Sequence, residues 1–483
     1  MKISDIFKLE KTQYELDFVD INTEVDTPLF LDPYFISKQQ FPFAQRSYTT
    51  LKSYFNYLLS LLRKQRIKEA KELFSHLGES NEICLGMSKG KPSGKGMGET
   101  DGERIFSNLI KSKAYETGLM EDIEDFRIFV PNVDKDKVSD MTTNIIKKHL
   151  IEYTQEQCKI WDIKLTCGVP SGHFWEEKQK VWEDEYTDML VIDGRKILLV
   201  PKRIVSYSKE YTHEKYKQHF VLNFLQNEHL RLQTGLVKER KDKFKTKYVT
   251  KKSVEEYEGK FNLLDKKWLA DFTLEHPEVF AEFKYKAINK IQSFENEELC
   301  KEELGNITNY LISRLKSIPP GAENANIYHK TVLGIMELLF YPYLANPKIE
   351  QEIHDGRKRI DITFDNCAES GFFFRLSTTY DIPSNFIIIE CKNYSKDLKN
   401  PELDQLSGRF SANRGKFGIS VCRTIENMDL FINRCIDTYK DGRGLIIPII
   451  DSDLIEMLEN YSSSGKHSWE KFFQDKFHEI GIR

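Results

Sequence analysis

The clearest hydrophobic pattern in the chain is a short apolar run that ends in charged residues. Four apolar residues, 386–389, lead directly into Glu390, Cys391 and Lys392. Such a short, β-branched run predicts a buried central strand. Because side chains alternate along a strand, Glu390 and Lys392 project to one face and Cys391 to the other. The strand therefore holds an acid and a base side by side, either as a functional site or as a salt bridge.

The pattern around this strand predicts an α/β domain, a mixed sheet flanked by helices. A helix over 327–341 carries Glu337, and a hairpin over 348–364, turning at 354–357, carries Asp361. A helix that begins near Pro401 follows the central strand and runs to Phe410. Apolar runs at 417–422 and 444–450 predict two further strands, each followed by a helix; Asp451 or Ser452 is expected to cap the last one.

The preceding two thirds of the chain predict a larger α+β region. We expect three elements there: a helix from Thr49 to about Phe74, a helix capped by Ser139 or Asp140 that runs to about Tyr153, and a hairpin over 188–202 that turns at Asp193–Gly194. Residues 211–232 and 253–316 also read as helical. Pro-Pro-Gly at 319–321 interrupts the helices, so we expect domains at 1–318 and 319–483, with a further break near 155–210.

Composition favours a soluble protein of several domains. The 483 residues are 40% hydrophobic and 30% charged, and the formal net charge is −4, which excludes a basic character overall. The eight cysteines form no Cys-x-x-Cys pair and no Cys/His cluster at zinc spacing, which favours reduced thiols and a cytoplasmic location. No apolar segment is long enough to predict a membrane span.

Two segments could contact phosphate. Residues 86–98 are rich in Gly and Lys but lack the glycine spacing of a Walker A loop, so a contact loop and a phosphate cradle both stay open. Residues 238–252 are the most basic run, with Phe244 and Tyr248 interleaved; this run is either a nucleic-acid patch or a solvated surface. The candidate nucleic-acid-binding residues in it are Lys238, Arg240, Lys241, Lys243, Lys245 and Lys247.

The C-terminal order of elements resembles the PD-(D/E)XK nuclease superfamily, which has the restriction-endonuclease-like fold. The features that carry the resemblance are a helix with Glu337, a hairpin with Asp361, and an apolar strand that ends in Glu390-Cys391-Lys392, all within about residues 327–465. The family usually has Pro before its Asp, where Ile360 stands here. Some relatives carry Gln-x-x-x-Tyr on the next helix, whereas Gln405 here is followed by Arg409.

The resemblance implies a Mg²⁺-dependent nuclease, with Mn²⁺ as a substitute. It implies Asp361, Glu390 and the backbone carbonyl of Cys391 as metal ligands, and Glu337 as an outer acid for a second metal or for metal-bound water. Lys392 would orient the attacking water and stabilise charge in the transition state.

Two further residues, Gln405 and Lys358, are candidate contacts to phosphate or metal-bound water. Residues 319–483 carry 20 Lys and Arg against 24 Asp and Glu. The contacts that bind a nucleic-acid backbone are therefore expected from the basic run, a homo-oligomer or a partner protein.

The leading hypothesis is a Mg²⁺-dependent DNA endonuclease. A long N-terminal region joined to such a domain resembles bacterial restriction or anti-phage defence effectors, with a defence protein as partner. The alternatives are a DNA repair or junction-resolving nuclease, and a catalytically silent nuclease-like module that binds DNA or supports assembly.

Overall fold

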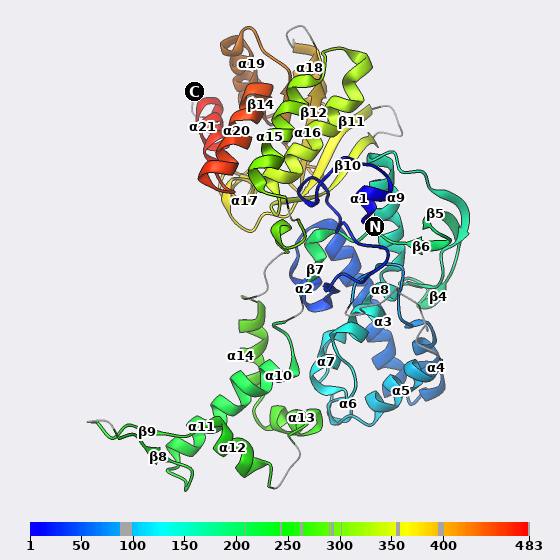
Figure 1. Ribbon diagram of the computed structural model, residues 1–483, viewed down its shortest axis with the longest axis vertical. Helices are drawn as coiled ribbons and strands as arrows, with labels where there is room; N and C mark the ends of the chain where they lie inside the picture. The colour runs from blue at the N-terminus through cyan, green and yellow to red at the C-terminus, as the bar shows by residue number, and fades with distance from the viewer. Residues whose placement is uncertain are drawn as a thin grey trace.

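Three parts of the chain can be followed in the computed structural model. Figure 1 shows a C-terminal part with a sheet, an N-terminal part beside it, and a helical arm that extends away from both. The structure describes residues 1–86, 99–207, 209–241, 244–260, 264–288, 290, 294–300, 302–353, 358–394 and 400–481. Most of the Gly/Lys-rich stretch (87–98), Lys243 and the predicted turn at 354–357 lie outside the described residues.

A five-stranded mixed sheet forms the centre of the C-terminal part. Its strands lie in the order β10-β11-β12-β13-β14; β10, β11 and β12 are antiparallel neighbours, and β12, β13 and β14 are parallel. The strands are β10 (Leu344–Ile353), β11 (Lys358–Asn366), β12 (Phe386–Lys392), β13 (Phe417–Cys422) and β14 (Leu445–Ile450). The predicted α/β architecture with a mixed sheet is confirmed.

Helices surround this sheet. They are α15 (Leu304–Ser317), α16 (Ala325–Phe340), α17 (Gly371–Thr378), α18 (Asn400–Ser407), α19 (Met428–Lys440), α20 (Asp451–Ser464) and α21 (Trp469–Gly481). Figure 1 shows α15 and α16 lying across the near side of the sheet. Helix α18 contacts β12 and β13, and it ends at Ser407 rather than at Phe410. The cap predicted at Asp451 or Ser452 is Ile450 instead, so that Asp451 is the first helical residue.

The central strand β12 is buried as its apolar run predicts. The side chains of residues 387–389 have no exposed surface, and Glu390 and Cys391 are only 1% exposed. A strand covered on both faces reads as continuous hydrophobic sequence. The charged end of the strand is therefore inside the protein as well.

The N-terminal part is mostly helical. Its longer elements are α3 (Pro42–Arg63), α5 (Glu99–Ile110), α8 (Lys135–Ile145) and α9 (Lys147–Ile160), and its shorter helices are α1 (Ile3–Ile6), α2 (Pro33–Lys38), α4 (Ile67–Glu72), α6 (Lys113–Glu116) and α7 (Phe126–Phe129). The strands are β1 (Phe30–Leu31), β2 (Thr166–Pro170), β3 (Phe174–Glu176), β4 (Val181–Glu183), β5 (Tyr186–Ile192), β6 (Arg195–Ile197) and β7 (Val205–Ser206).

The bounds of two N-terminal helices differ from the sequence prediction, and the helix expected to run to about Tyr153 ends at Ile145. Helix α3 begins at Pro42, where a proline suits the first helical turn, and the chain leaves the helix before Gln65, which has a left-handed φ of 57°. Helix α8 begins after Asp134, whose side chain accepts a hydrogen bond from the Lys137 amide at 3.1 Å. Ser139 lies inside α8, where its hydroxyl binds the Leu31 amide instead of capping the helix. The hairpin that turns at Asp193–Gly194 is confirmed as β5 and β6, but β6 ends at Ile197 rather than at residue 202.

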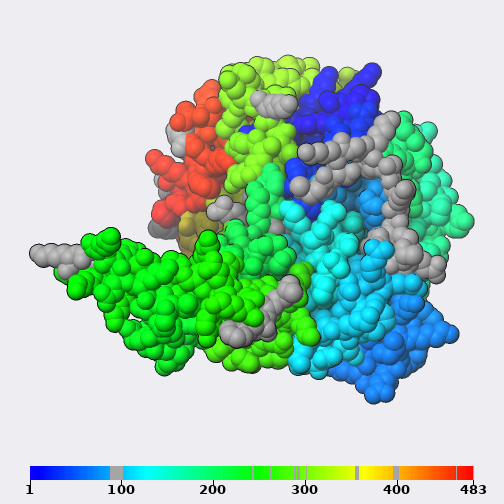
Figure 2. Space-filling view, turned by 60° about the horizontal axis from the view of Figure 1, so that its bottom comes forward, coloured from blue at the N-terminus to red at the C-terminus, as the bar shows by residue number. Residues whose placement is uncertain are grey.

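The arm projects from the N-terminal part, against which its helices near residues 213–216 and 266–275 pack. It contains α10 (His213–Tyr216), α11 (Leu222–Arg231), the short hairpin of β8 (Lys238–Glu239) and β9 (Lys247–Tyr248), α12 (Lys251–Glu258), α13 (Lys266–Glu275) and α14 (Pro277–Ile288). A small core of its own, around Leu222, Val249 and Val254, supports the hairpin. Figure 2 shows the arm standing out from the rest of the molecule. Within the described part of the chain, no helix combines the length and the apolar character needed to cross a membrane.

The N-terminal part is joined to the sheet by buried contacts. The short turn Gln13–Glu15 packs against α16, and the Asn346 amide donates to the Asp17 carboxylate at 3.0 Å. Helix α15 precedes the domain boundary predicted at 318/319 but packs against α16 and α20, which follow it. That boundary stays a prediction, although α15 packs as part of the C-terminal domain.

Candidate functional site

The acid and base predicted at the end of β12 meet an aspartate from the neighbouring strand. The antiparallel register pairs Ile362 with Ile389, so one further step places Asp361 opposite Glu390. The Cys391 amide donates to Asp361 Oδ2 at 3.0 Å. Side chains that are directly opposite on antiparallel strands are close neighbours. The sheet therefore brings two carboxylates to one spot.

Lys392 bridges these two carboxylates. Its Nζ lies 2.6 Å from Glu390 Oε1 and 3.6 Å from Asp361 Oδ2. Burial lowers the pKa of Lys392, but Glu390 and Asp361 outweigh burial and raise this pKa above its usual value. Lys392 is therefore an ammonium at neutral pH.

The second oxygen of Glu390 binds a cation that the sequence analysis did not single out. Arg409, in the loop after α18, donates from Nη1 to Glu390 Oε2, and both residues are buried. Burial raises the pKa of Glu390, and Asp361 raises it further, whereas Lys392 and Arg409 lower it. Arg409 occupies the fourth position after Gln405, where the Gln-x-x-x-Tyr pattern has tyrosine, and that departure from the pattern was the one signal for it in the sequence.

His329 contacts the other predicted ligand group. It lies near the start of α16, and its Nε2 is 3.0 Å from the Cys391 carbonyl oxygen. A carbonyl oxygen only accepts hydrogen bonds, so Nε2 carries the proton. Burial lowers the pKa of His329, so the imidazole is neutral at physiological pH. Nothing in the spacing of the sequence connects His329 to Cys391, because the two lie on different elements.

The oxygen atoms at this position suit a hard divalent cation. Asp361, Glu390 and the Cys391 carbonyl are the oxygen donors that Mg²⁺ prefers, and Lys392 shows that one cation can contact both carboxylates. In the described residues, no three His, Cys, Asp or Glu side chains converge as a metal centre. The residues fit a site with two side-chain ligands and one carbonyl, provided that the ammonium of Lys392 moves away from the carboxylates.

Glu337 is not brought to this site. It lies eight residues after His329, about 12 Å further along α16 at the usual rise per residue. Its carboxylate is fully buried, with Oε2 3.7 Å from Lys202 Nζ at the junction with the N-terminal part. The outer-acid role implied by the resemblance therefore has no support from its position.

Two other predicted residues, Gln405 and Lys358, lie at the edge of the cluster of Asp361, Glu390 and Lys392 or outside it. Gln405 is exposed on α18 and has no contact with Asp361, Glu390 or Lys392 among the described residues. Lys358 is exposed, and its Nζ donates to the Gly408 carbonyl at 3.0 Å. Lys358 is thus fixed beside the loop that carries Arg409.

The predicted basic patch lies on the hairpin of the arm. Its described cations, Lys238, Arg240, Lys241, Lys245 and Lys247, are all exposed. Phe244 is 85% exposed, and the guanidinium of Arg240 lies 5.6 Å from the centre of the Tyr248 ring. Exposed cations with an exposed aromatic ring suit a nucleic-acid backbone and its bases.

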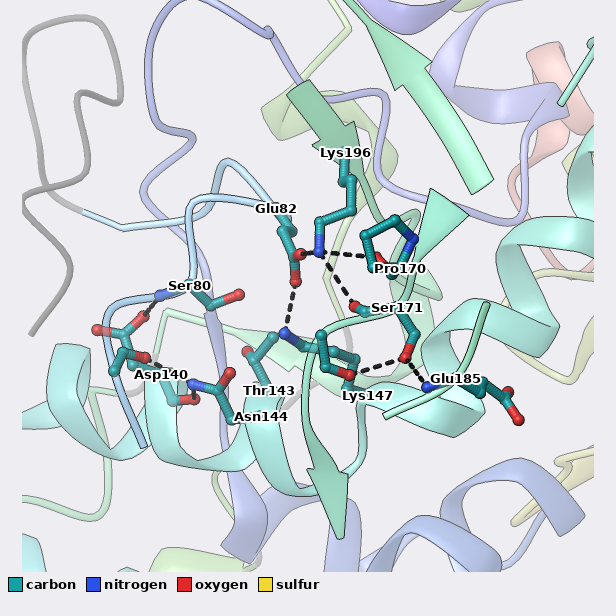
Figure 3. Close-up of polar contacts among 12 residues, drawn as sticks. Ser80, Glu82, Asp140, Thr143, Asn144, Lys147, Pro170, Ser171, Glu185 and Lys196 are labelled. Atoms are coloured by element: carbon teal, nitrogen blue, oxygen red, sulfur yellow. Dashed lines mark hydrogen bonds and ion pairs between the residues drawn. The ribbon is translucent and has the colours of Figure 1, made fainter. Parts of the chain in front are cut away.

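A second charged cluster lies inside the N-terminal part. Figure 3 shows Lys147 and Lys196 directed at Glu82, at 2.8 Å and 3.0 Å. Lys196 also donates to the carbonyls of Pro170 and Ser171, each at 3.2 Å. Gly172 has a φ of 75°, and a Cβ there would lie 3.2 Å from Lys196 Nζ. The cluster ties the strands β2 and β6 to α9, which indicates a structural role.

Replacing Glu82 should therefore destabilise the N-terminal part. In a Glu82→Gln protein, two partly buried ammonium groups lose their shared carboxylate, and we expect unfolding to become easier by about 2 kcal/mol. Urea unfolding followed by circular dichroism measures this. Glu185→Gln is the matched control, because the Glu185 side chain is exposed and only its backbone N–H and carbonyl contact Ser171 in the cluster. Equal stability of the two variants would contradict the structural role.

Asp365 should make the stability of the protein depend on pH. It lies on β11, four residues after Asp361, and burial raises its pKa from the usual 3.8 to about 7. The folded protein then keeps a proton that the unfolded chain loses, so stability is greatest below pH 4 and falls as pH rises to about 7. Relative to Asp365→Asn, which keeps the contact with Asn346, the wild type should lose about 2–4 kcal/mol over this range.

Urea unfolding at a series of pH values compares the two proteins. A difference in stability that stays constant between pH 4 and pH 7 would show that Asp365 is ionised in the folded protein.

Comparisons with known proteins cover only the N-terminal part. Residues 8–212 match the model of a family described as a domain of unknown function (DUF8370). The match ends at Thr212, directly before α10, so the arm and the five-stranded sheet lie outside it. No curated protein and no solved structure matches the chain.

Proposed function

We propose that this protein is a divalent-cation-dependent nuclease that hydrolyses phosphodiester bonds of DNA. The observation that supports this most is the placement of Asp361, Glu390 and Lys392 together at the end of the central strand of a mixed sheet. The same order of elements suggested the PD-(D/E)XK resemblance. The restriction-endonuclease-like fold is part of the proposal.

Each residue of the site has a role in this chemistry. A Mg²⁺ or Mn²⁺ ion held by Asp361, Glu390 and the Cys391 carbonyl would supply charge neutralisation and a more acidic water. Lys392, released from the carboxylates, would donate to the phosphate oxygens where negative charge develops. Arg409 lowers the pKa of Glu390 against the larger opposing effect of burial and fixes the orientation of its carboxylate, and His329 fixes the Cys391 carbonyl.

The biological role that we propose is restriction or anti-phage defence inside a cell, with the N-terminal part and the arm selecting the substrate. The support is that the two kinds of residue needed for this role lie on different parts of the structure. The candidate catalytic residues lie on the sheet, whereas the exposed basic patch lies on the arm. A substrate that spans both would explain why the C-terminal domain itself carries no positive excess.

Removing the arm's charge should weaken DNA binding in a salt-dependent manner. Each lost phosphate contact reduces the slope of log K against log salt by about 0.9 on duplex DNA. Four substitutions to glutamine, at Lys238, Arg240, Lys241 and Lys245, should therefore reduce the slope by up to about 3.6. Fluorescence anisotropy at several salt concentrations gives the slope. The control is glutamine at four exposed lysines elsewhere, Lys64, Lys68, Lys111 and Lys471, and an equal loss there would refute a specific patch.

A panel of substrates tests the proposed activity. Purified protein is incubated with supercoiled, linear, single-stranded and branched DNA and with RNA, each with Mg²⁺, Mn²⁺ or a chelator. We expect cleavage of DNA that requires the divalent ion. A strong preference for branched DNA would favour the repair alternative, and cleavage of RNA alone would overturn the choice of substrate.

A second candidate function is a silent nuclease-like module. Its support is that both oxygens of Glu390 already bind cations of the chain itself, Lys392 and Arg409. A buried carboxylate neutralised in this way can be purely structural. Calorimetric titration with Mn²⁺ separates the two functions, because the silent module would take up no ion at Asp361 and Glu390.

A further inference from the structure

A cavity lies where the N-terminal segment meets the C-terminal helices, away from Asp361 and Glu390. Its volume is about 360 Å³, within the range of small-molecule sites. Residues 7–11, the end of α9, α15 and α16 form its walls. The residues used below are Lys8, Lys11, Trp161, Tyr310, Arg314 and Lys330.

The wall of the cavity carries more cationic than anionic side chains. Lys11 is matched by Glu15 at 2.7 Å, and Lys330 by Asp162. Lys8 and Arg314 are both exposed, and in the described part of the chain neither has a carboxylate partner. Glu10 is one further carboxylate in the lining, so Lys8, Arg314 and Glu10 together leave an excess of one positive charge, which favours an anionic ligand.

Aromatic groups lie beside these cations. Tyr310 and Arg314 are one helical turn apart on α15 and therefore share a face, and the Tyr310 ring is 44% exposed. Trp161 is 92% buried, and its indole Nε1 has no hydrogen-bond acceptor. The exposed Tyr310 ring beside Arg314 is therefore the aromatic surface on which a ligand could stack.

The backbone of the cavity wall is held in an unusual conformation. Lys8, Glu10 and Asp162, which all line the cavity, have left-handed φ values of 50°, 53° and 55°. Such conformations in residues other than glycine are uncommon and concentrate at functional sites. The wall is thus shaped before any ligand arrives.

We propose that this cavity binds a nucleoside phosphate. The base would stack on Tyr310, and the phosphates would contact Lys8 and Arg314. Lys330 follows His329 directly on α16, so a bound nucleotide would contact the same helical turn that touches the Cys391 carbonyl. Binding itself does not depend on the proposed nuclease activity.

Isothermal titration calorimetry of the full chain tests the site. The probes are the four ribonucleoside diphosphates, with adenosine and inorganic phosphate as fragments. We expect at least one diphosphate to bind at least tenfold more tightly than either fragment. Arg314→Gln and Tyr310→Ala should each weaken this binding by about tenfold. Lys316→Gln, an exposed residue on the same helix outside the cavity, should leave it unchanged.

Two results would overturn the site. One is the absence of binding by all four diphosphates at millimolar concentration. The other is binding that Arg314→Gln and Tyr310→Ala both leave unchanged, which would place the ligand elsewhere. Both variants change exposed side chains, and their melting temperatures verify that they fold.

Discussion

A Lys392→Met protein should cleave DNA about 10²–10³-fold more slowly than the wild type and still bind divalent ions. The Lys392 ammonium lies 2.6 Å from Glu390 and 3.6 Å from Asp361, so it would compete with the proposed metal ion for the same oxygens. Methionine keeps most of the side-chain length but removes that competition. It also removes the donor that would stabilise charge on the phosphate. Single-turnover cleavage and Mn²⁺ calorimetry measure the two effects separately.

Lys440→Met provides the control for this variant. Lys440 is exposed on α19 and far in sequence from the site residues, so both cleavage and ion binding should match the wild type. Unchanged cleavage by Lys392→Met would remove Lys392 from the chemistry. A loss of ion binding in the same variant would mean that the lysine organises the carboxylates rather than competing for them.

A Lys202→Met protein should lose about 3–5 kcal/mol of stability, the largest effect that we expect outside the site. The Lys202 side chain is completely buried between Glu337, 3.7 Å away, and Asp17. Burial raises the pKa of both carboxyl groups, and Lys202 opposes this shift. Without the ammonium, folding either buries uncompensated negative charge or takes up protons.

The loss of stability in Lys202→Met should depend on pH in a definite direction. Raised carboxyl pKa values mean that stability is present at low pH and lost as pH rises through them, so the deficit of Lys202→Met should shrink on acidification. A Lys202→Met/Glu337→Gln double variant should recover part of the loss. Urea unfolding at several pH values tests both expectations, with the exposed Lys164→Met as control. A deficit independent of pH would contradict the buried-charge account.

The sheet could be predicted from the sequence because its signals are local. A continuous apolar run identifies a doubly covered strand, as for residues 386–389, and Asp193–Gly194 specifies a tight turn. Helix boundaries were less predictable because several residues compete to cap the same helix at different positions. Asp134 and Ser139 are both good caps, and only the contact of Ser139 with the Leu31 amide decides between them.

Only the part of the site that lies on neighbouring strands could be predicted, because strand periodicity places those residues. Alternation along β12 placed Glu390 and Lys392 together, and the hairpin added Asp361. Arg409 and His329 reach the site from a loop and a helix, through packing that no spacing encodes. Glu337 was assigned by resemblance, but its side of α16 is covered by the N-terminal part, and the sequence of α16 alone does not reveal that cover.

The most direct test is cleavage of supercoiled plasmid DNA by wild-type and Asp361→Asn proteins, side by side, with and without Mg²⁺. Asp429→Asn, an exposed aspartate on α19, is the matched control. The account predicts nicking or cutting by the wild type and the control only when Mg²⁺ is present, and a loss of about 10²–10³-fold in Asp361→Asn. Equal cleavage by wild type and Asp361→Asn would contradict the assignment of the site.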